Sequence, residues 1–413
     1  MPRSELAHAG FIESLEIKGF KSLVEQRIEL GQLNVLIGAN GSGKTAVLEA
    51  IGVLGAAADG RVDDTELLRR GVRPGVPKLY KSAFADLKKL RRVISLRASS
   101  RAGAYYRVGL DNPQETSASP WRFQSEMIGR RESKLLSRSP RGGNIWHAPD
   151  EKTTLSDLDP FIGLSRGGLS LRERKSPGVS LMLGSLKGFA IYDPQTSILR
   201  GTQPDLLQRD PLGLGGGRLA EAVAFLKSSK QAERLHAEFE SLVEWASSIA
   251  VAAPTPDLIS PSIPVTSEVV RFSDRFLRDD RNQLSAYDAS EGALYVLFAL
   301  AMVLHPRSPR FFAIENVGHA LHPRLARKLF ATLARLARRH RRQIIVTTHN
   351  PLVLDSLELA DERVRLLAVE RTAGGHTKIT RIAHSEAIER AQVSGLTISQ
   401  MWTRGLLGAV PPL

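Results

Sequence analysis

The feature that most constrains the fold of this chain is the glycine-rich segment GANGSGKT at residues 38–45. A short apolar run at residues 33–37 precedes it, and residues 46–54 follow it with apolar side chains on one helical stripe. Glycines allow the backbone to curl so that successive N–H groups point inward at phosphate oxygens. A helix that begins at such a loop adds a dipole that favours the same anion. The sequence therefore predicts a strand, a phosphate-binding loop and a helix, in that order.

Two residues at the end of this loop carry the charge and the metal chemistry. Lys44 places a cation where the β- and γ-phosphates of a nucleotide would lie, and the Thr45 hydroxyl is placed to bind Mg²⁺. The predicted nucleotide-binding residues of this segment are Gly38, Ala39, Asn40, Gly41, Ser42, Gly43, Lys44, Thr45 and Ala46. The flanking strand and helix disfavour the alternative, a glycine-rich turn that binds nothing.

Composition excludes several classes of protein. The 413 residues allow two or three domains, and 42% hydrophobic with 24% charged residues is typical of globular proteins. The longest nearly apolar run, residues 292–304, is too short to span a bilayer, and the N-terminus lacks the apolar core of a signal peptide. The absence of cysteine excludes disulfides, thiolate metal sites and a cysteine nucleophile. We therefore expect a cytoplasmic protein with no membrane partner.

Strand and helix patterns near both ends of the chain predict an α/β fold. Residues 11–17 alternate apolar and polar side chains, as a strand does. Towards the C-terminus follow a buried helix, a strand, a basic helix and a strand, at residues 292–304, 310–314, 323–342 and 343–347. Strand, helix and strand at this spacing indicate a mostly parallel sheet with crossover helices.

The middle of the chain is less regular and predicts a large mixed helical insertion. Residues 112–149, rich in Ser, Arg, Gly and Pro, are expected to form a long surface excursion. A helix is expected over about residues 219–249, before the prolines of residues 254–264. The predicted domains are the two parts of one head, at residues 1–80 and 281–413, and an inserted lobe for DNA or partner binding at residues 81–280.

Three polar sites in the C-terminal part each have two readings when taken alone. Ser290, followed by Glu291 and Gly292, is a good N-cap for the buried helix. Glu315 ends an apolar strand, from which a carboxylate can reach Mg²⁺ on the phosphate loop, although many strands end in Glu. His349 follows the next strand, at the edge where open α/β sheets bind ligands, but a histidine there is often a packing residue.

The order and spacing of these sites resemble the head domain of ABC-type ATPases, and more narrowly the SMC/RecF/OLD branch. Ser290 precedes Glu315 by 25 residues, and Glu315 precedes His349 by 34. The segments GFKS, LHPR, TTHNP and WTRGLLG resemble the opening, the D-loop, the switch-histidine segment and a tail of that branch, at residues 19–22, 321–324, 347–351 and 402–408. The resemblance covers residues 11–55 and 285–410 and implies an ABC-type head fold.

The resemblance also implies an ATP-dependent dimer with ATP and Mg²⁺ as cofactors. Lys21 and Ser22 would lie beside the nucleotide, and Thr45 and Glu315 would hold the Mg²⁺. The signature residues Ser290, Glu291 and Gly292 would close on the γ-phosphate bound by Lys44 of a second subunit. ATP binding would assemble a homodimer or a higher homo-oligomer, and hydrolysis would release it. The catalytic residues so implied are Lys44, Glu315, Asn316 and His349.

The sequence departs from the family pattern at the end of the Walker B strand. The family usually has Asp-Glu there, with Glu as general base, whereas this chain has Glu315 and Asn316. Glu315 can still serve the metal, and Asn316 can orient a water molecule but cannot accept its proton. We therefore expect slow hydrolysis or a base elsewhere. The segment IENVGHA at residues 314–320 resembles the Asp-Asn variant of anti-phage ATPases such as Septu.

The chain is basic, with 57 Lys and Arg against 43 Asp and Glu and a net charge of +14. Residues 88–107 and 323–342 hold clusters of Lys and Arg without an acid. Exposed rows of this kind bind phosphate backbones without reading sequence, although they also occur as solvated surface. The first run is the better candidate because it lies in the insertion. Its expected nucleic-acid contacts are Lys88, Lys89, Arg91, Arg92, Arg97 and Arg101.

Three functions remain open from the sequence. The leading hypothesis is an ATP-gated dimer that controls a separate effector, a nuclease or toxin, in anti-phage defence. The second is a RecF-like DNA-repair ATPase that binds DNA directly. The third is a nucleotide switch that does not hydrolyse ATP because Asn316 replaces the base.

Overall fold

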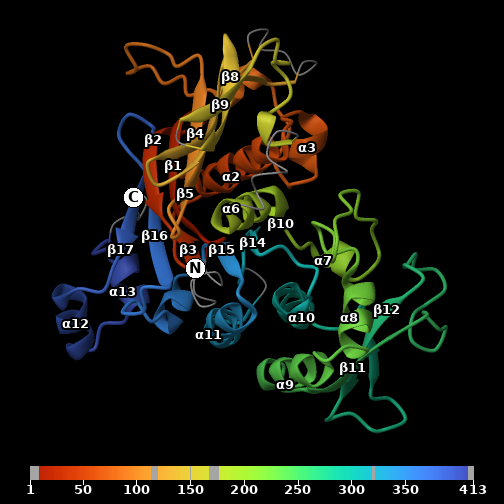
Figure 1. Ribbon diagram of the computed structural model, residues 1–413. Helices are drawn as coiled ribbons and strands as arrows, with labels where there is room; N and C mark the ends of the chain where they lie inside the picture. The colour runs from red at the N-terminus through yellow and green to blue at the C-terminus, as the bar shows by residue number, and fades with distance from the viewer. Residues whose placement is uncertain (1–8, 113–119, 149, 167–175, 319–320, 408–413) are drawn as a thin grey trace.

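The computed structural model describes residues 9–112, 120–148, 150–166, 176–318 and 321–407, and the fold is described for these residues. Two large sheets lie one above the other with helices between them, and a smaller lobe of helices and a three-stranded sheet lies to one side (Figure 1). Within the described residues, no helix combines the length and the apolar character needed to cross a membrane.

A six-stranded sheet forms the centre of the fold. Its first five strands are parallel, and the sixth is antiparallel to its neighbour. Their order is β10 (Ile191–Tyr192), β14 (Phe311–Ile314), β15 (Gln343–Thr348), β3 (Leu33–Ile37), β16 (Val364–Arg371) and β17 (Thr377–Ile382). The mostly parallel sheet of an α/β fold is therefore confirmed, as are the strands expected at residues 33–37, 310–314 and 343–347.

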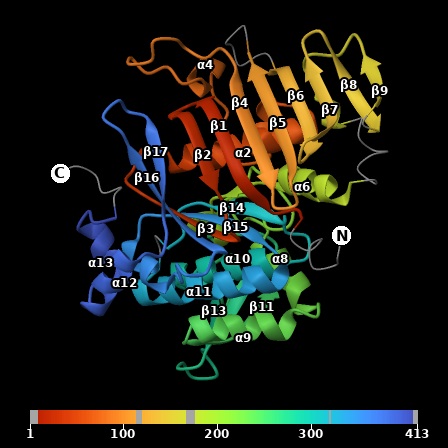
Figure 2. The same ribbon diagram turned by 60° about the vertical axis from the view of Figure 1, so that its left-hand side comes forward.

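The second sheet has eight antiparallel strands and extends well beyond the first (Figure 2). Their order is β2 (Leu23–Glu29), β1 (Ile12–Phe20), β4 (Ile94–Ser100), β5 (Ala104–Asp111), β6 (Arg122–Arg130), β7 (Ser133–Ser139), β8 (Gly142–Ala148) and β9 (Glu151–Leu155). The surface excursion expected at residues 112–149 is wrong, because β6, β7 and β8 lie there. β1 belongs to the predicted head part, residues 1–80, whereas β4 belongs to the predicted insertion, residues 81–280. Their pairing places both strands in one sheet.

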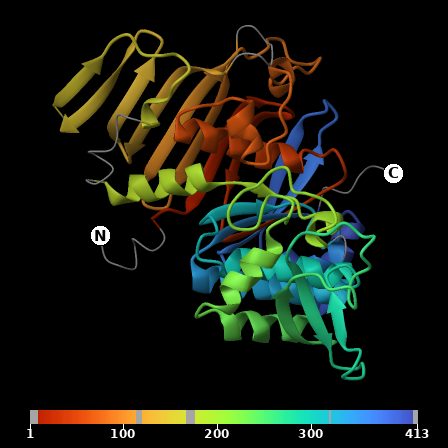
Figure 3. The same ribbon diagram turned by 90° about the vertical axis from the view of Figure 1, so that its right-hand side faces the viewer.

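Helices cover both faces of the six-stranded sheet. α2 (Lys44–Asp59) and α6 (Pro177–Gly188) lie between the two sheets and share one apolar core with them. α10 (Glu291–Leu304) and α11 (Pro323–His340) pack on the opposite face in a second core (Figure 3). Alternate residues of β3 enter the two cores, since Val35 belongs to one and Leu36 to the other. The helices expected at residues 292–304 and 323–342 are confirmed.

The lobe beside α10 replaces the single helix expected at residues 219–249. This segment forms α8 (Leu219–Lys227), α9 (Ala232–Leu242) and the first part of β11 (Ala246–Ala252). β11 pairs with β12 (Val269–Asp274), which pairs with β13 (Gln283–Ser285). The remaining short elements are α3 (Asp64–Leu68), α4 (Pro77–Tyr80), η1 (Leu164–Arg166), α7 (Thr196–Leu199), η2 (Pro351–Ser356), α12 (Glu386–Val393) and α13 (Ile398–Thr403).

Candidate nucleotide-binding site

The predicted phosphate loop connects β3 to α2 at the carboxyl edge of the parallel sheet. β3 is fully buried, and α2 begins at Lys44 immediately after Gly43, which has the left-handed φ of 111°. Glycine adopts this conformation without steric cost, and the turn directs the N-terminus of α2 at the loop. A 16-residue helix thus presents its positive dipole end where a phosphate would bind.

The ammonium group of Lys44 is held inside the curl of the loop. Its Nζ donates hydrogen bonds to the carbonyl oxygens of Gly38 and Ala39, both at 2.8 Å. Burial lowers the pKa of Lys44 to about 8, while the negative charge of Glu315 opposes this shift. The cation therefore lies in a poorly solvated position, where its attraction for a phosphate is stronger than in water.

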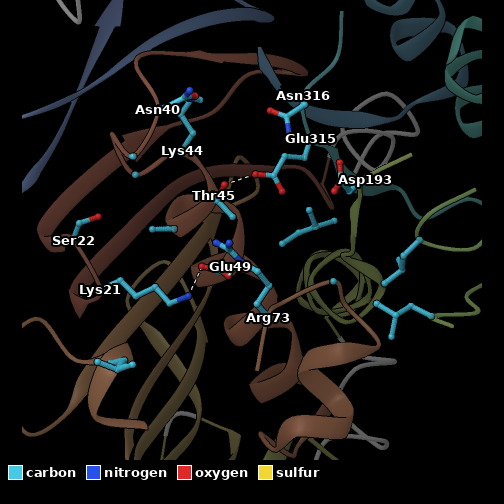
Figure 4. A pocket seen from close by; sticks show the side chains of 18 of the residues that line it. Lys21, Ser22, Asn40, Lys44, Thr45, Glu49, Arg73, Asp193, Glu315 and Asn316 are labelled. Carbon is cyan, nitrogen blue, oxygen red and sulfur yellow. Dashed lines mark hydrogen bonds and ion pairs between the residues drawn. The ribbon is translucent and has the colours of Figure 1, made fainter. Parts of the chain in front are cut away.

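Thr45 and Glu315 meet although 270 residues separate them in the chain. The Thr45 hydroxyl donates a hydrogen bond to the Glu315 carboxylate (Figure 4). Burial is the main reason that the pKa of Glu315 is raised. A hydroxyl and a carboxylate oxygen are suitable ligands for Mg²⁺, which completes its coordination with water and substrate phosphates. The donor set therefore fits the predicted metal, for which Thr45 and Glu315 would be the ligands.

Asn316 and His349 lie beside this pair. Asn316 has a φ of 54°, and its backbone N–H donates to the Thr347 hydroxyl at 2.9 Å. Asparagine tolerates this left-handed conformation better than most residues. His349 follows β15, and burial and the charge of Lys44 lower its pKa, against a hydrogen bond with the backbone of Gly38. The histidine therefore lies beside the phosphate loop.

Lys21 and Ser22 form the turn between β1 and β2 on the other side of α2. Lys21 Nζ lies 2.5 Å from an oxygen of Glu49, whose side chain is only 1% exposed. Arg73 contacts the second oxygen of Glu49 at 3.1 Å. Sequence analysis missed Glu49 and Arg73, although an acid in an otherwise apolar helical stripe was a signal for Glu49.

Side chains of the hairpin formed by β16 and β17 contact the backbone of the phosphate loop. The Thr377 hydroxyl lies 2.7 Å from both the Ser22 hydroxyl and the Ser42 carbonyl oxygen. Arg371 Nε donates to the Gly41 carbonyl oxygen at 2.8 Å. A Cβ atom at Gly43 would lie only 2.1 Å from Thr377 Oγ1. The hairpin contacts were not predicted, since nothing local in the sequence pairs residues more than 300 positions apart.

One cavity of about 1180 Å³ brings most of the predicted site together. Its size is sufficient for a nucleotide, because pockets for small ligands and cofactors commonly measure 300–1000 Å³. The predicted residues that line it are Lys21, Ser22, Asn40, Gly41, Gly43, Lys44, Thr45, Ala46, Glu315, Asn316 and His349. Gly38, Ala39 and Ser42 belong to the same loop but do not line the cavity. A further wall comes from residues 203–207, which sequence analysis also missed.

Over residues 33–355, the chain matches the protein family described as "AAA domain, putative AbiEii toxin, Type IV TA system". The chain belongs to this family. A 72-residue stretch is 40% identical to the DNA replication and repair protein RecF of Halothermothrix orenii, and it covers 17% of this chain and 19% of that protein. This family membership and the RecF likeness agree with the predicted resemblance to ABC-type ATPases of the SMC/RecF branch.

Two solved structures of SMC heads resemble the chain at low identity. The head domain from Thermotoga maritima is 14% identical, with a TM-score of 0.39, and the match covers 90% of this chain and 99% of that one. The Pyrococcus furiosus head, with an extended coiled coil and bound to the C-terminal domain of ScpA, is 13% identical, with a TM-score of 0.48 and coverages of 94% and 100%. The narrower Septu resemblance stays a prediction. His319 and Ala320 of its segment, and Gly408 of the tail segment, lie outside the described residues.

The predicted signature residues do not line the cavity of their own chain. Ser290 is the N-cap of α10, and its side chain accepts a hydrogen bond from the Ala293 N–H at 3.3 Å. Glu291 accepts a hydrogen bond from the Thr196 hydroxyl. Neither these two residues nor Gly292 lines the cavity of the same chain. Their predicted role therefore depends on a second copy.

The expected nucleic-acid contacts lie before β4, along it and in the turn that follows it. Lys88, Lys89, Arg91, Arg92 and Arg101 are exposed, and Arg97 is half-buried. Ion pairs join three of the arginines to carboxylates: Arg91 to Glu25, Arg92 to Asp111 and Arg97 to Glu16. On the basic helix α11, Lys328, Arg335 and Arg338 likewise pair with acids of neighbouring elements. Part of the positive charge of both runs is thus balanced within the chain.

Proposed function

We propose that this protein binds ATP with Mg²⁺ in the described cavity and hydrolyses it slowly. The observation that carries the proposal is the convergence of Lys44, Thr45 and Glu315 at one sheet edge. Lys44 would neutralise charge on the β- and γ-phosphates, and Thr45 and Glu315 would hold Mg²⁺, which supplies further charge neutralisation when bound. His349, beside the loop, would sense the γ-phosphate.

Slow turnover follows from the residue after Glu315. The Asn316 amide can orient an attacking water molecule but cannot accept its proton, and a positioned base typically accelerates such a step about 10²- to 10⁴-fold. The left-handed backbone at Asn316 also suits asparagine better than glutamate. The alternative is a switch that binds ATP without turnover, in which Asn316 abolishes the chemistry.

ATP would join two copies of the chain. The N-terminus of α10, with Ser290, Glu291 and Gly292, provides a helix dipole and backbone N–H groups but does not line the cavity of its own chain. A second copy could place this segment on the γ-phosphate above Lys44. The competing reading is that Ser290 serves only as the helix cap that the structure contains.

The ATP-bound dimer would gate a nucleic-acid-directed effector in anti-phage defence in the cytoplasm. The family description names a toxin of a type IV toxin–antitoxin system, and the relative RecF is described as a DNA replication and repair protein. The exposed side chains of the basic run at residues 88–107, which include Lys88 and Lys89, would contact the nucleic acid. Direct DNA binding in repair, without an effector, is the second candidate function, and the RecF likeness favours it.

Equilibrium binding of fluorescent ATP, light-scattering mass and phosphate release test the proposal on the full chain. Lys44→Ala should remove ATP binding, because it deletes the cation of the loop, while Lys328→Ala, an exposed lysine of α11, should leave it unchanged. The mass should double with ATP and Mg²⁺ but not with ADP. Normal ATP affinity of Lys44→Ala would refute the site, and ATP binding without phosphate release would support the switch.

A further inference from the structure

The parallel strands β10 and β14 are neighbours in the sheet, and each is followed by an acidic residue at the same edge. β10 and β14 pair in register, with Tyr192 opposite Ile314. The Glu315 N–H continues this ladder by donating to the Tyr192 carbonyl oxygen at 2.8 Å. The next residues along the two strands are Asp193 and Glu315, so they leave the sheet side by side.

Both carboxylates face the cavity beside the phosphate loop. Asp193 and Glu315 line it together with Lys44 and Thr45. Figure 4 shows Glu315 between the Thr45 hydroxyl on one side and Asp193 on the other. The two acids leave adjacent, in-register strands, and neighbouring strands of a sheet lie about 4.8 Å apart.

The arrangement has an electrostatic cost that a divalent cation would remove. Two like charges at the mouth of an anion-binding loop repel each other, and they repel the phosphates of an incoming nucleotide. A cation held between the carboxylates and the phosphates reverses both interactions. The part of the chain that the structure describes contains no group of three or more His, Asp or Glu side chains that could hold a metal ion, so the remaining ligands beside the two carboxylates would be Thr45, water and phosphate oxygens.

We propose that Asp193 is the second carboxylate of the divalent-cation site, acting with Glu315 and Thr45 when a nucleotide is bound. The inference rests on the proposed function, since the phosphates complete the site. It assigns the acid to the end of β10, an element that the Walker B strand pairs with but that the sequence motifs do not include.

Measurements of one variant with and without metal distinguish a role of Asp193 in cation binding from a structural role. Asp193→Asn keeps the size of the side chain and removes its charge. With metal, it should weaken cation binding by at least about tenfold, the effect typical of losing a carboxylate near a metal. Without metal, it should leave the affinity for the nucleotide equal or increased, because a repulsive charge has gone. Asp193→Glu, which keeps a carboxylate, should retain most of the cation affinity.

The experiment uses Mn²⁺ as the probe and a non-hydrolysable ATP analogue on the full-length chain. Electron paramagnetic resonance measures free Mn²⁺ during titration of the analogue complex, and fluorescence measures analogue affinity in EDTA. The matched control is Asp86→Asn, which removes an exposed carboxylate that pairs with His376 and does not line the cavity. Its Mn²⁺ affinity should stay within twofold of the wild type.

The outcomes separate this inference from the proposed function. If the wild type binds the analogue and Mn²⁺, but Asp193→Asn binds Mn²⁺ within twofold of the wild type, the role of Asp193 is overturned and the proposed function stands. If the wild type binds neither, both are overturned. Equal losses of analogue affinity in EDTA and of Mn²⁺ affinity would mean that Asp193 supports the fold of the cavity, which also overturns the inference.

Discussion

Gly43→Ala tests whether the C-terminal hairpin supports the phosphate loop. The new Cβ would lie 2.1 Å from Thr377 Oγ1 and 3.0 Å from Ser22 Oγ, so the Thr377 side chain would have to move. Residue 43 has a φ of 111°, which costs a residue other than glycine about 1–2 kcal/mol. Loss of the Thr377 hydroxyl contacts adds about 1–2 kcal/mol. The free energy of unfolding should therefore fall by about 2–4 kcal/mol.

A double-mutant cycle isolates the contact. Thr377→Ala alone should lower the free energy of unfolding by about 1–2 kcal/mol, because it removes hydrogen bonds of a side chain that is 1% exposed. In the double variant the clash is already relieved, so only the backbone strain and the lost bonds remain. The combined loss should be smaller than the sum of the single losses by about 1–2 kcal/mol. Urea unfolding followed by circular dichroism measures all four free energies.

Gly395→Ala is the matched control. Gly395 also has a left-handed φ, 85°, but a Cβ there would meet no atom within 4 Å. It should cost about 1 kcal/mol, and its effect should add to that of Thr377→Ala. If the losses of unfolding free energy for Gly43→Ala and Thr377→Ala also added within about 0.5 kcal/mol, the two residues would not be coupled, and the reasoning would be wrong.

Three further predictions concern the dimer, turnover and pH. Ser290→Arg should leave ATP binding intact but block the ATP-dependent rise in light-scattering mass, whereas normal dimerisation would leave residue 290 as a helix cap alone. Asn316→Glu should raise steady-state phosphate release about 3- to 30-fold, and a rate at or below wild type in ATP-binding protein would place the base elsewhere. Burial and the charges of Arg307 and Arg342 lower the pKa of His305 to about 4 from 6.5. The unfolded chain therefore takes up a proton first, and stability present above pH 6.5 should fall by about 1–2 kcal/mol towards pH 4, allowing for solvent screening. His305→Asn should flatten this dependence in urea titrations, and an unchanged slope would contradict it.

The phosphate loop and its flanking elements could be predicted because their signals are local. Strand, glycine-rich turn and helix follow one another within residues 33–59, and β3 is buried throughout and apolar except for Asn34, since both of its faces are covered. The same reasoning located β14, α11 and β15. The apolar strand that ends at Glu315, taken together with the family resemblance, predicted a carboxylate within reach of the phosphate loop, and the structure shows its contact with Thr45.

The outer strands of the antiparallel sheet could not be predicted because they carry little hydrophobic pattern. β9 is exposed along most of its length, and β7 buries only Leu136 and Arg138. Without a buried face, alternation of apolar and polar residues disappears, and glycine and serine then resemble a loop. Thr377 and Asp193 were missed for a different reason: each lies beside the site only because its strand pairs with another strand, and the register between distant strands has no local signature.

The position of β3 has a consequence for synthesis of the chain. Both of its partners, β15 and β16, come from the last fifth of the sequence. β3 therefore cannot pair until residues 343–371 have left the ribosome. At about 5–20 residues per second, this delay is roughly 15–60 s. During that time a strand with every side chain destined for the interior stays unpaired and exposed to aggregation or to chaperones. A prematurely terminated chain also lacks the carboxylate and the hairpin that complete the loop. Synthesis of this protein therefore yields a nucleotide site only after its final strands have been added.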